Sequence, residues 1–149
     1  MKKDLPDLEI SEIFLDKIIE HAQRAYPLEC CGILAGKGGE IRRIYPMRNV
    51  EESQFSYFMD PEEQFRIFRE IDEEGLDLSA IYHSHPHSPP YPSKRDVDLA
   101  FYPHSHILIV SLRDRQVPEI CAFQVAEGEV KKQAITISAK REYHREEIF

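Results

Sequence analysis

The sequence predicts an α/β fold in which helices pack on one mixed β-sheet. Apolar residues recur at helical spacing in some segments, and short apolar runs bounded by glycine, proline or charged turns lie between them. Helical and strand patterns therefore alternate along the chain, as expected of a sheet covered by helices. A length of 149 residues and 42% hydrophobic residues suit a single domain, 1–149, with one core.

The first part of the chain predicts a helix followed by a hairpin. The helix runs from Ser11, placed to cap its start, to Ala25, and Pro27 ends it. Its apolar residues recur every three to five positions: Ile13, Phe14, Ile18 and Ala22. The run CCGILAG then predicts a buried strand, and the turn Lys37-Gly38-Gly39 leads to a second strand over 41–47.

A second helix is predicted after Asp60-Pro61, an N-cap followed by a proline at the first helical position. We expect Phe65, Phe68 and Ile71 to form its buried face, Gly75 to stop it, and its acidic face to be solvated.

The second half of the chain predicts a strand over 78–83, a stiff loop with four prolines and a short helix from Ser93 to about Phe101. Two more strands are predicted over 106–112 and 119–125, and a final strand over 130–137. The residues 140–149 fit either a helical turn or a frayed tail.

The composition excludes several classes of function. Nineteen basic residues stand against 27 acidic ones, so a net charge of −8 argues against binding to nucleic acid or anionic lipid. Three cysteines, two of them adjacent, lack disulfide-framework spacing and suit a reducing compartment. Neither an apolar run of roughly 18 residues nor a secretory signal is present, so we expect a soluble, cytoplasmic protein.

A candidate metal site follows the strand predicted over 78–83. Alternation along a strand places His83 and His85 on one face and Ser84 on the other, so two imidazoles can reach one metal ion. The short helix then presents Asp96 in its first turn. Two neutral imidazoles and one carboxylate suit a catalytic zinc site, which keeps its fourth position for water.

Simpler interpretations exist for the same residues. His104-Ser105-His106 repeats the tripeptide without the downstream serine and aspartate, and we interpret this copy as the ordinary start of a strand. Ser93 and Asp96 also have capping-box spacing, which would explain both without a metal. A capped helix is nevertheless a rigid platform for a ligand, and we favour the metal site.

Hydrolysis at such a site also needs a proton acceptor and a hydrogen-bond donor for the developing oxyanion. Glu29, just before the apolar strand, is the candidate acceptor, although a surface residue at the start of a strand would look the same. The Ser93 hydroxyl is the candidate donor.

Together these motifs resemble the JAMM (MPN-plus, JAB1-type) metalloprotease family in its compact prokaryotic form. The resemblance rests on Pro27-Leu28-Glu29-Cys30-Cys31-Gly32, His83-Ser84-His85-Pro86, Pro92-Ser93 and Asp96, and extends from about Ile10 to Ile137. It implies a cytidine-deaminase-like αβα arrangement with a mixed curved sheet. It also implies zinc (Zn2+) held by His83, His85 and Asp96, with Glu29 as general acid and base and Ser93 stabilising the oxyanion.

The resemblance also implies a zinc-dependent peptidase or isopeptidase. The short chain leaves little room for the substrate-clamping insertions of deubiquitinating members, and it looks more like members that process ubiquitin-like or sulfur-carrier proteins ending in Gly-Gly. The oligomeric state stays open.

Three other functions are possible for a chain of this fold class or with this type of metal site, and each requires a feature that can be checked. A non-catalytic MPN-type scaffold that binds ubiquitin-like partners would use the same fold with zinc absent or merely structural, and the five signature residues argue against it. A nucleobase deaminase would need a Pro-Cys-x-x-Cys motif together with His-x-Glu, and the chain lacks the cysteine motif. A thermolysin-like protease would need His-Glu-x-x-His, which the chain also lacks.

Overall fold

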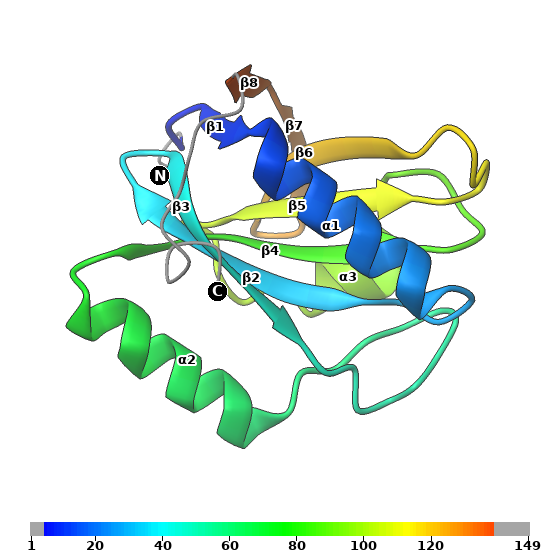
Figure 1. Ribbon diagram of the computed structural model, residues 1–149, viewed down its shortest axis with the longest axis horizontal. Coiled ribbons are helices and arrows are strands. Elements are labelled where there is room, and N and C mark those ends of the chain that lie inside the picture. The colour runs from blue at the N-terminus through cyan, green and yellow to red at the C-terminus, as the bar shows by residue number, and fades with distance from the viewer. Residues whose placement is uncertain (1–4, 139–149) are drawn as a thin grey trace.

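A computed structural model describes residues 5–138 of the chain. Within them, eight strands form one curved mixed sheet in the order β7-β6-β5-β4-β2-β3-β1-β8, accompanied by three helices (Figure 1). The strands are β1 (Leu8–Ser11), β2 (Cys31–Lys37), β3 (Glu40–Met47), β4 (Asp77–His85), β5 (His106–Ser111), β6 (Glu119–Ala126), β7 (Glu129–Gln133) and β8 (Ile135–Ser138), and the helices are α1 (Glu12–Ala25), α2 (Pro61–Glu73) and α3 (Lys94–Asp98). The predicted α/β fold class is confirmed.

Helix α1 lies across one face of the sheet (Figure 1). The Ser11 side chain caps its start by accepting a hydrogen bond from the backbone of Ile13, as predicted, and a cis Tyr26–Pro27 peptide follows its end. Its apolar stripe packs into one core cluster with residues of the central strands, including Leu34, Tyr82 and Leu108. Burial of this stripe fixes the helix on the sheet.

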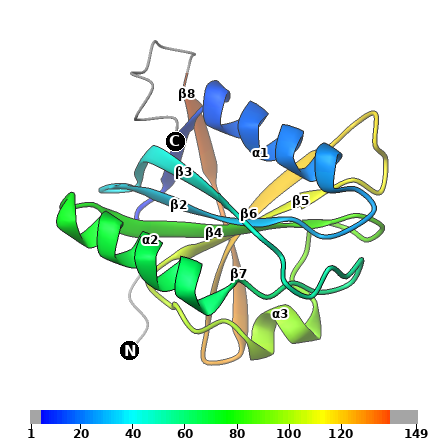
Figure 2. The same ribbon diagram turned by 60° about the horizontal axis from the view of Figure 1, so that its bottom comes forward.

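Helix α2 packs against the opposite face of the sheet (Figure 2). Its buried residues are Ile67 and Ile71, which join a second core cluster with Ile33 and Ile81. The predicted face was partly wrong, because Phe65 is 66% exposed. At about 100° per residue, Phe65 lies roughly 200° around the helix from Ile67, away from the sheet.

Strand β4 lies near the middle of the sheet, antiparallel to β2 and parallel to β5. It continues two residues beyond the predicted end, through His85, so both histidines of the first tripeptide belong to the strand. Each neighbour pairs with β4 close to these histidines, since Cys31 pairs with His83 and Ser111 pairs with His85. The sheet therefore holds both histidine backbones from two sides.

The prediction of a single last strand over 130–137 was wrong in one respect. The segment divides at Ala134 into β7, which pairs with β6, and β8, which pairs in parallel with β1. Strand β1 was not predicted, because its four residues gain order only by pairing with β3 and with the distant β8. The prediction for 140–149 lies outside the described residues.

No helix within residues 5–138 combines the length and the apolar character that crossing a bilayer requires.

Candidate active site

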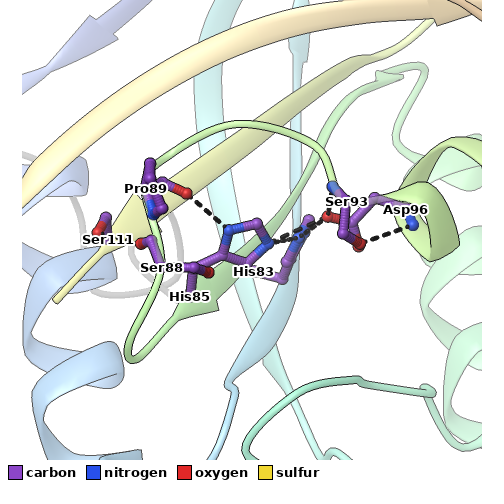
Figure 3. A network of polar contacts seen from close by, with 7 residues as sticks. All are labelled: His83, His85, Ser88, Pro89, Ser93, Asp96 and Ser111. Atoms are coloured by element: carbon purple, nitrogen blue, oxygen red, sulfur yellow. Dashed lines mark hydrogen bonds and ion pairs between the residues drawn. The ribbon is translucent and has the colours of Figure 1, made fainter. Parts of the chain in front are cut away.

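Three predicted ligand residues converge at the end of β4. His83 Nε2 lies 3.1 Å from Asp96 Oδ2, His85 Nε2 lies 3.0 Å from the same oxygen, and the two imidazole nitrogens lie 3.2 Å apart. Figure 3 shows the two histidine rings and the Asp96 carboxylate meeting between the strand and helix α3. The second tripeptide does not join them: His106 begins β5, as predicted, and its Nε2 donates to the carbonyl oxygen of Pro6.

The proline loop after β4 orients His85. Its Nδ1 donates a hydrogen bond of 2.9 Å to the carbonyl oxygen of Pro89, and the Ser111 hydroxyl holds the same loop by donating to the carbonyl oxygen of Ser88 (Figure 3). Because Nδ1 carries the hydrogen in this bond, the lone pair of Nε2 faces the cluster when the ring is neutral. This is the arrangement by which proteins present a histidine to a metal ion.

A capping box at the start of α3 presents Asp96. Ser93 Oγ accepts from the Asp96 backbone nitrogen at 3.1 Å, and Asp96 Oδ2 accepts from the Ser93 backbone nitrogen at 2.9 Å. The same Oδ2 contacts both imidazoles, so the capping and ligand interpretations hold together. The helix is shorter than predicted and ends at Asp98.

The electrostatics of the cluster favour a charged carboxylate between the imidazoles. Burial opposes ionisation of Asp96, but hydrogen bonds to His83 and His85 outweigh it and hold the pKa of Asp96 well below its usual range. Burial lowers the pKa of His83. Burial also opposes the charged form of His85, but its bond to Asp96 and its contact with Pro89 raise the pKa of that ring.

Glu29 lies at the same end of the sheet, just before β2. Cys31 pairs with His83, and the Ser84 backbone nitrogen donates to the carbonyl oxygen of Cys30, which places Glu29 beside the end of β4. Its side chain is 5% exposed, and its Oε1 has no hydrogen-bond partner among the described residues. Burial raises the pKa of Glu29 to about 8, with His85 opposing and Asp96 reinforcing the shift. A carboxylate with such a pKa can accept and return a proton near neutrality.

Two supports of Glu29 were not found from the sequence. The buried Ser84 hydroxyl accepts from the Cys30 backbone nitrogen at 2.8 Å, and Asn49 Nδ2 donates to the Glu29 carbonyl oxygen at 3.0 Å. Strand alternation predicted that Ser84 lies on the face away from the histidines, but it did not predict the contact with Cys30. No local pattern links Asn49 to Glu29, twenty positions earlier.

Tyr57 was also missed. Its ring stacks on His83 with the centroids 4.8 Å apart and the planes 28° apart. It follows β3 in a loop without regular structure, where the sequence carries no pattern that predicts a contact with β4. The stacking fixes the plane of the His83 ring.

The donor set fits a divalent cation. Two imidazole nitrogens and a carboxylate oxygen lie within 4.8 Å of one another, mostly shielded from solvent. The lone pairs of the His85 nitrogen and of the Asp96 oxygen point towards the same position. A cation at that position would therefore bind both atoms. The buried Oε1 of Glu29 has no partner among the described residues, and this carboxyl group interacts electrostatically with His85 and Asp96.

Comparison with known proteins relates the chain to one family. Residues 11–127 match the family Prok-JAB, described as prokaryotic homologs of the JAB domain. The CysO-cysteine peptidase of Mycobacterium tuberculosis is 35% identical over 125 residues, which cover 83% of this chain and 86% of that protein. The desampylase of Haloferax volcanii is 38% identical over 103 residues, 64% of this chain and 74% of that protein.

Solved structures share the fold. A protein from Desulfitobacterium hafniense is 31% identical and superposes with a TM-score of 0.81, covering 92% of this chain and 97% of that one. A JAB1/MPN domain protein from Archaeoglobus fulgidus has a TM-score of 0.60 at 19% identity, over 89% of this chain and 98% of that one. This second likeness concerns the fold alone.

Proposed function

The chain belongs to the family of prokaryotic homologs of the JAB domain, and from this premise we propose that it is a zinc-dependent peptidase or isopeptidase. The bond that it hydrolyses follows the C-terminal Gly-Gly of its substrate, a ubiquitin-like or sulfur-carrier protein. The observation that carries the proposal is the convergence of His83, His85 and Asp96 beside the buried carboxyl group of Glu29.

His83, His85 and Asp96 would hold the zinc ion. Two neutral imidazoles and one carboxylate are a catalytic zinc set, and together with a zinc ion they would carry a net charge of about +1. A zinc ion bound there supplies a Lewis acid that polarises the scissile carbonyl group and favours deprotonation of water near neutral pH.

Glu29 acts as the general base and then as the general acid. Its carboxylate takes the proton from the attacking water and returns it to the nitrogen of the leaving amine. Its burial supports this role, since a desolvated carboxylate binds a proton more strongly than an exposed one. The contacts through Cys30 and Asn49 hold its backbone in place.

Ser93 supplies the oxyanion donor. Its Oγ accepts the capping hydrogen bond from the Asp96 backbone nitrogen, which leaves the hydroxyl hydrogen free to donate to the substrate carbonyl oxygen. The capping box thus gives the hydroxyl a fixed position next to Asp96.

The substrate class comes from the relatives. Two of them are named as a CysO-cysteine peptidase and a desampylase, and a third, 39% identical over 56% of this chain, as a probable TtuB-protein conjugate cleaving protease. These names support a small carrier protein as substrate, carrying either an added amino acid or a lysine conjugate.

Incubation of zinc-loaded protein with carrier proteins tests the proposal. The carriers end in Gly-Gly and are either extended by further residues or conjugated to lysine, and mass spectrometry locates the cut. We expect hydrolysis after the second glycine, with one zinc per chain by elemental analysis. A purified protein that contains no zinc, binds the carriers and cleaves none of them would instead favour the non-catalytic scaffold.

A further inference from the structure

A cavity of about 290 Å³ adjoins the site on one side. His83 and Asp96 are among its walls, whereas Glu29 and Ser93 are not. Most of the remaining walls are apolar, including Phe58 from the β3–α2 loop, Leu99 and Ala100 after α3, and Ile81 and Ile107 from the sheet. The cavity therefore opens beside His83 and Asp96, and its other walls are mostly apolar.

The cavity extends along the sheet away from the ligand cluster. Ile81 and Ile107 are paired in the parallel ladder of β4 and β5, and Ile81 precedes His83 by two residues on the same face. A strand rises about 3.3 Å per residue, so these side chains lie roughly 7 Å from His83 along the strand. The cavity thus offers apolar contacts at this distance from the cluster.

The position of Glu29 decides which part of the substrate lies in the cavity. In the function proposed above, Glu29 returns a proton to the leaving nitrogen, so the leaving group lies on the Glu29 side. Since Glu29 does not line the cavity, the cavity lies on the side of the acyl group, which belongs to the carrier protein. The last two residues of the carrier are glycines without side chains.

We propose that the cavity binds the apolar side chain of the third residue from the end of the carrier protein. This inference rests on the proposed function. In an extended tail the two glycines span about 7 Å, the same distance that separates the paired isoleucines from His83. The first side chain that precedes the glycines therefore reaches the apolar part of the cavity.

The walls define the chemical class of this side chain. Arg95 lines the cavity, but its guanidinium group is paired with the Glu51 carboxylate, so it adds no uncompensated charge. A leucine or phenylalanine side chain fits the volume and loses only contact with water, whereas an aspartate would lose its hydration against walls that are mostly apolar. We expect binding to favour the apolar residues over aspartate by about tenfold or more.

Binding of labelled peptides tests the inference independently of turnover. Zinc-loaded Glu29→Gln protein is titrated into eight-residue fluorescent peptides that contain X-Gly-Gly followed by one serine, where X is leucine, phenylalanine, alanine or aspartate. Fluorescence anisotropy gives each Kd. We expect peptides with leucine or phenylalanine to bind at least about tenfold more tightly than the peptide with aspartate.

Variants locate the preference in the cavity. Ala100→Phe fills the cavity and should bring the ratio of affinities close to one. Ile107→Ala enlarges it and should shift the preference from leucine towards phenylalanine. Phe65→Ala is the matched control, because Phe65 is an exposed apolar residue of α2 that does not line the cavity, and it should keep the original ratio.

Either of two results would overturn the inference: equal affinity for all four peptides, or an unchanged ratio of affinities in Ala100→Phe. Cleavage by the unsubstituted protein is measured separately. A preference that Ala100→Phe abolishes, combined with no cleavage of any carrier, would contradict the proposed hydrolysis while supporting the cavity assignment.

Discussion

Ser84 and Cys30 are joined by two hydrogen bonds, in which the Ser84 hydroxyl accepts from the Cys30 backbone at 2.8 Å and the Ser84 backbone donates to Cys30 at 3.1 Å. Ser84 lies between the two candidate histidine ligands, and Cys30 directly follows Glu29. This contact therefore sets the position of the proton-transfer residue relative to the metal ligands.

Replacement of Ser84 by alanine should reduce turnover without removing zinc. The Cys30 backbone N–H would lose its acceptor in a buried position, which costs about 1–3 kcal/mol of the free energy of unfolding. A small displacement of Glu29 should lower kcat by about 10- to 100-fold. Ser79→Ala, in the same strand at the far end from the site, is the control for kcat. Wild-type kcat in the Ser84 variant would contradict the positioning role.

Glu29→Gln should retain the metal and lose activity. The amide has nearly the same shape as the carboxyl group but cannot take the proton from water, so turnover should fall by about 10²- to 10⁴-fold. Elemental analysis and peptide cleavage are measured on the same preparation. Substantial cleavage by the zinc-loaded variant would refute the assigned role.

Asp96→Asn should reduce zinc content. An asparagine oxygen can still accept the capping hydrogen bond from the Ser93 backbone, but the neutral amide is a poor ligand for zinc. Asp98→Asn is the matched control, because Asp98 lies on the same helix and pairs with the exposed Lys94. An equal zinc-to-protein ratio in both variants would remove Asp96 from the ligand set.

His21 should make the fold sensitive to acid. Burial lowers the pKa of His21 to about 4, and its Nδ1 is hydrogen-bonded to the Tyr82 hydroxyl at 2.7 Å. In the unfolded chain His21 binds this proton near pH 6.5. The contribution of His21 to the free energy of unfolding is therefore constant above that pH and falls as the pH decreases towards 4.

Denaturant unfolding at pH 7.5 and pH 5 measures this effect. The loss of unfolding free energy between the two values should be smaller in His21→Gln than in the wild type, whereas the exposed His104→Gln should match the wild type. An identical loss in all three proteins would rule out His21 as a source of acid sensitivity.

Gly32→Ala should destabilise β2. A Cβ atom at this position would lie 2.1 Å from the ring of the buried Tyr82, far inside van der Waals contact. Overpacking of this kind costs about 1–3 kcal/mol. Thermal unfolding should show a lower Tm, and combining the change with Tyr82→Leu should cost less than the sum of the single changes. Additive losses would show that the two residues do not compete for space.

Local patterns were sufficient to predict α1, the β2–β3 hairpin and the capping box. In each case the decisive residue, such as Ser11 or Ser93, acts within a few positions of itself. The predicted ligands were brought together for a similar reason, because strand alternation and a short loop link His83, His85 and Asp96. Their catalytic roles stay predictions.

Long-range contacts account for what the sequence did not reveal. Strand β1 forms only against strands that lie far away in the chain, and nothing near Ala134 marks the division between β7 and β8. Asn49 and Tyr57 act across loops, and their contacts exist only after the sheet has assembled. Phe65 was misplaced because two apolar stripes were possible on α2 and packing selected the one with Ile67.

The pairing of β8 with β1 has a consequence for synthesis on the ribosome. The parallel partner of residues 8–11, residues 135–138, is made more than a hundred positions later in the chain. Until then the outer side of β1 has unsatisfied backbone groups, so a nascent chain stalled before residue 135 exposes an edge that invites aggregation. The edge at β1 is thus covered only after residues 135–138 have been synthesised.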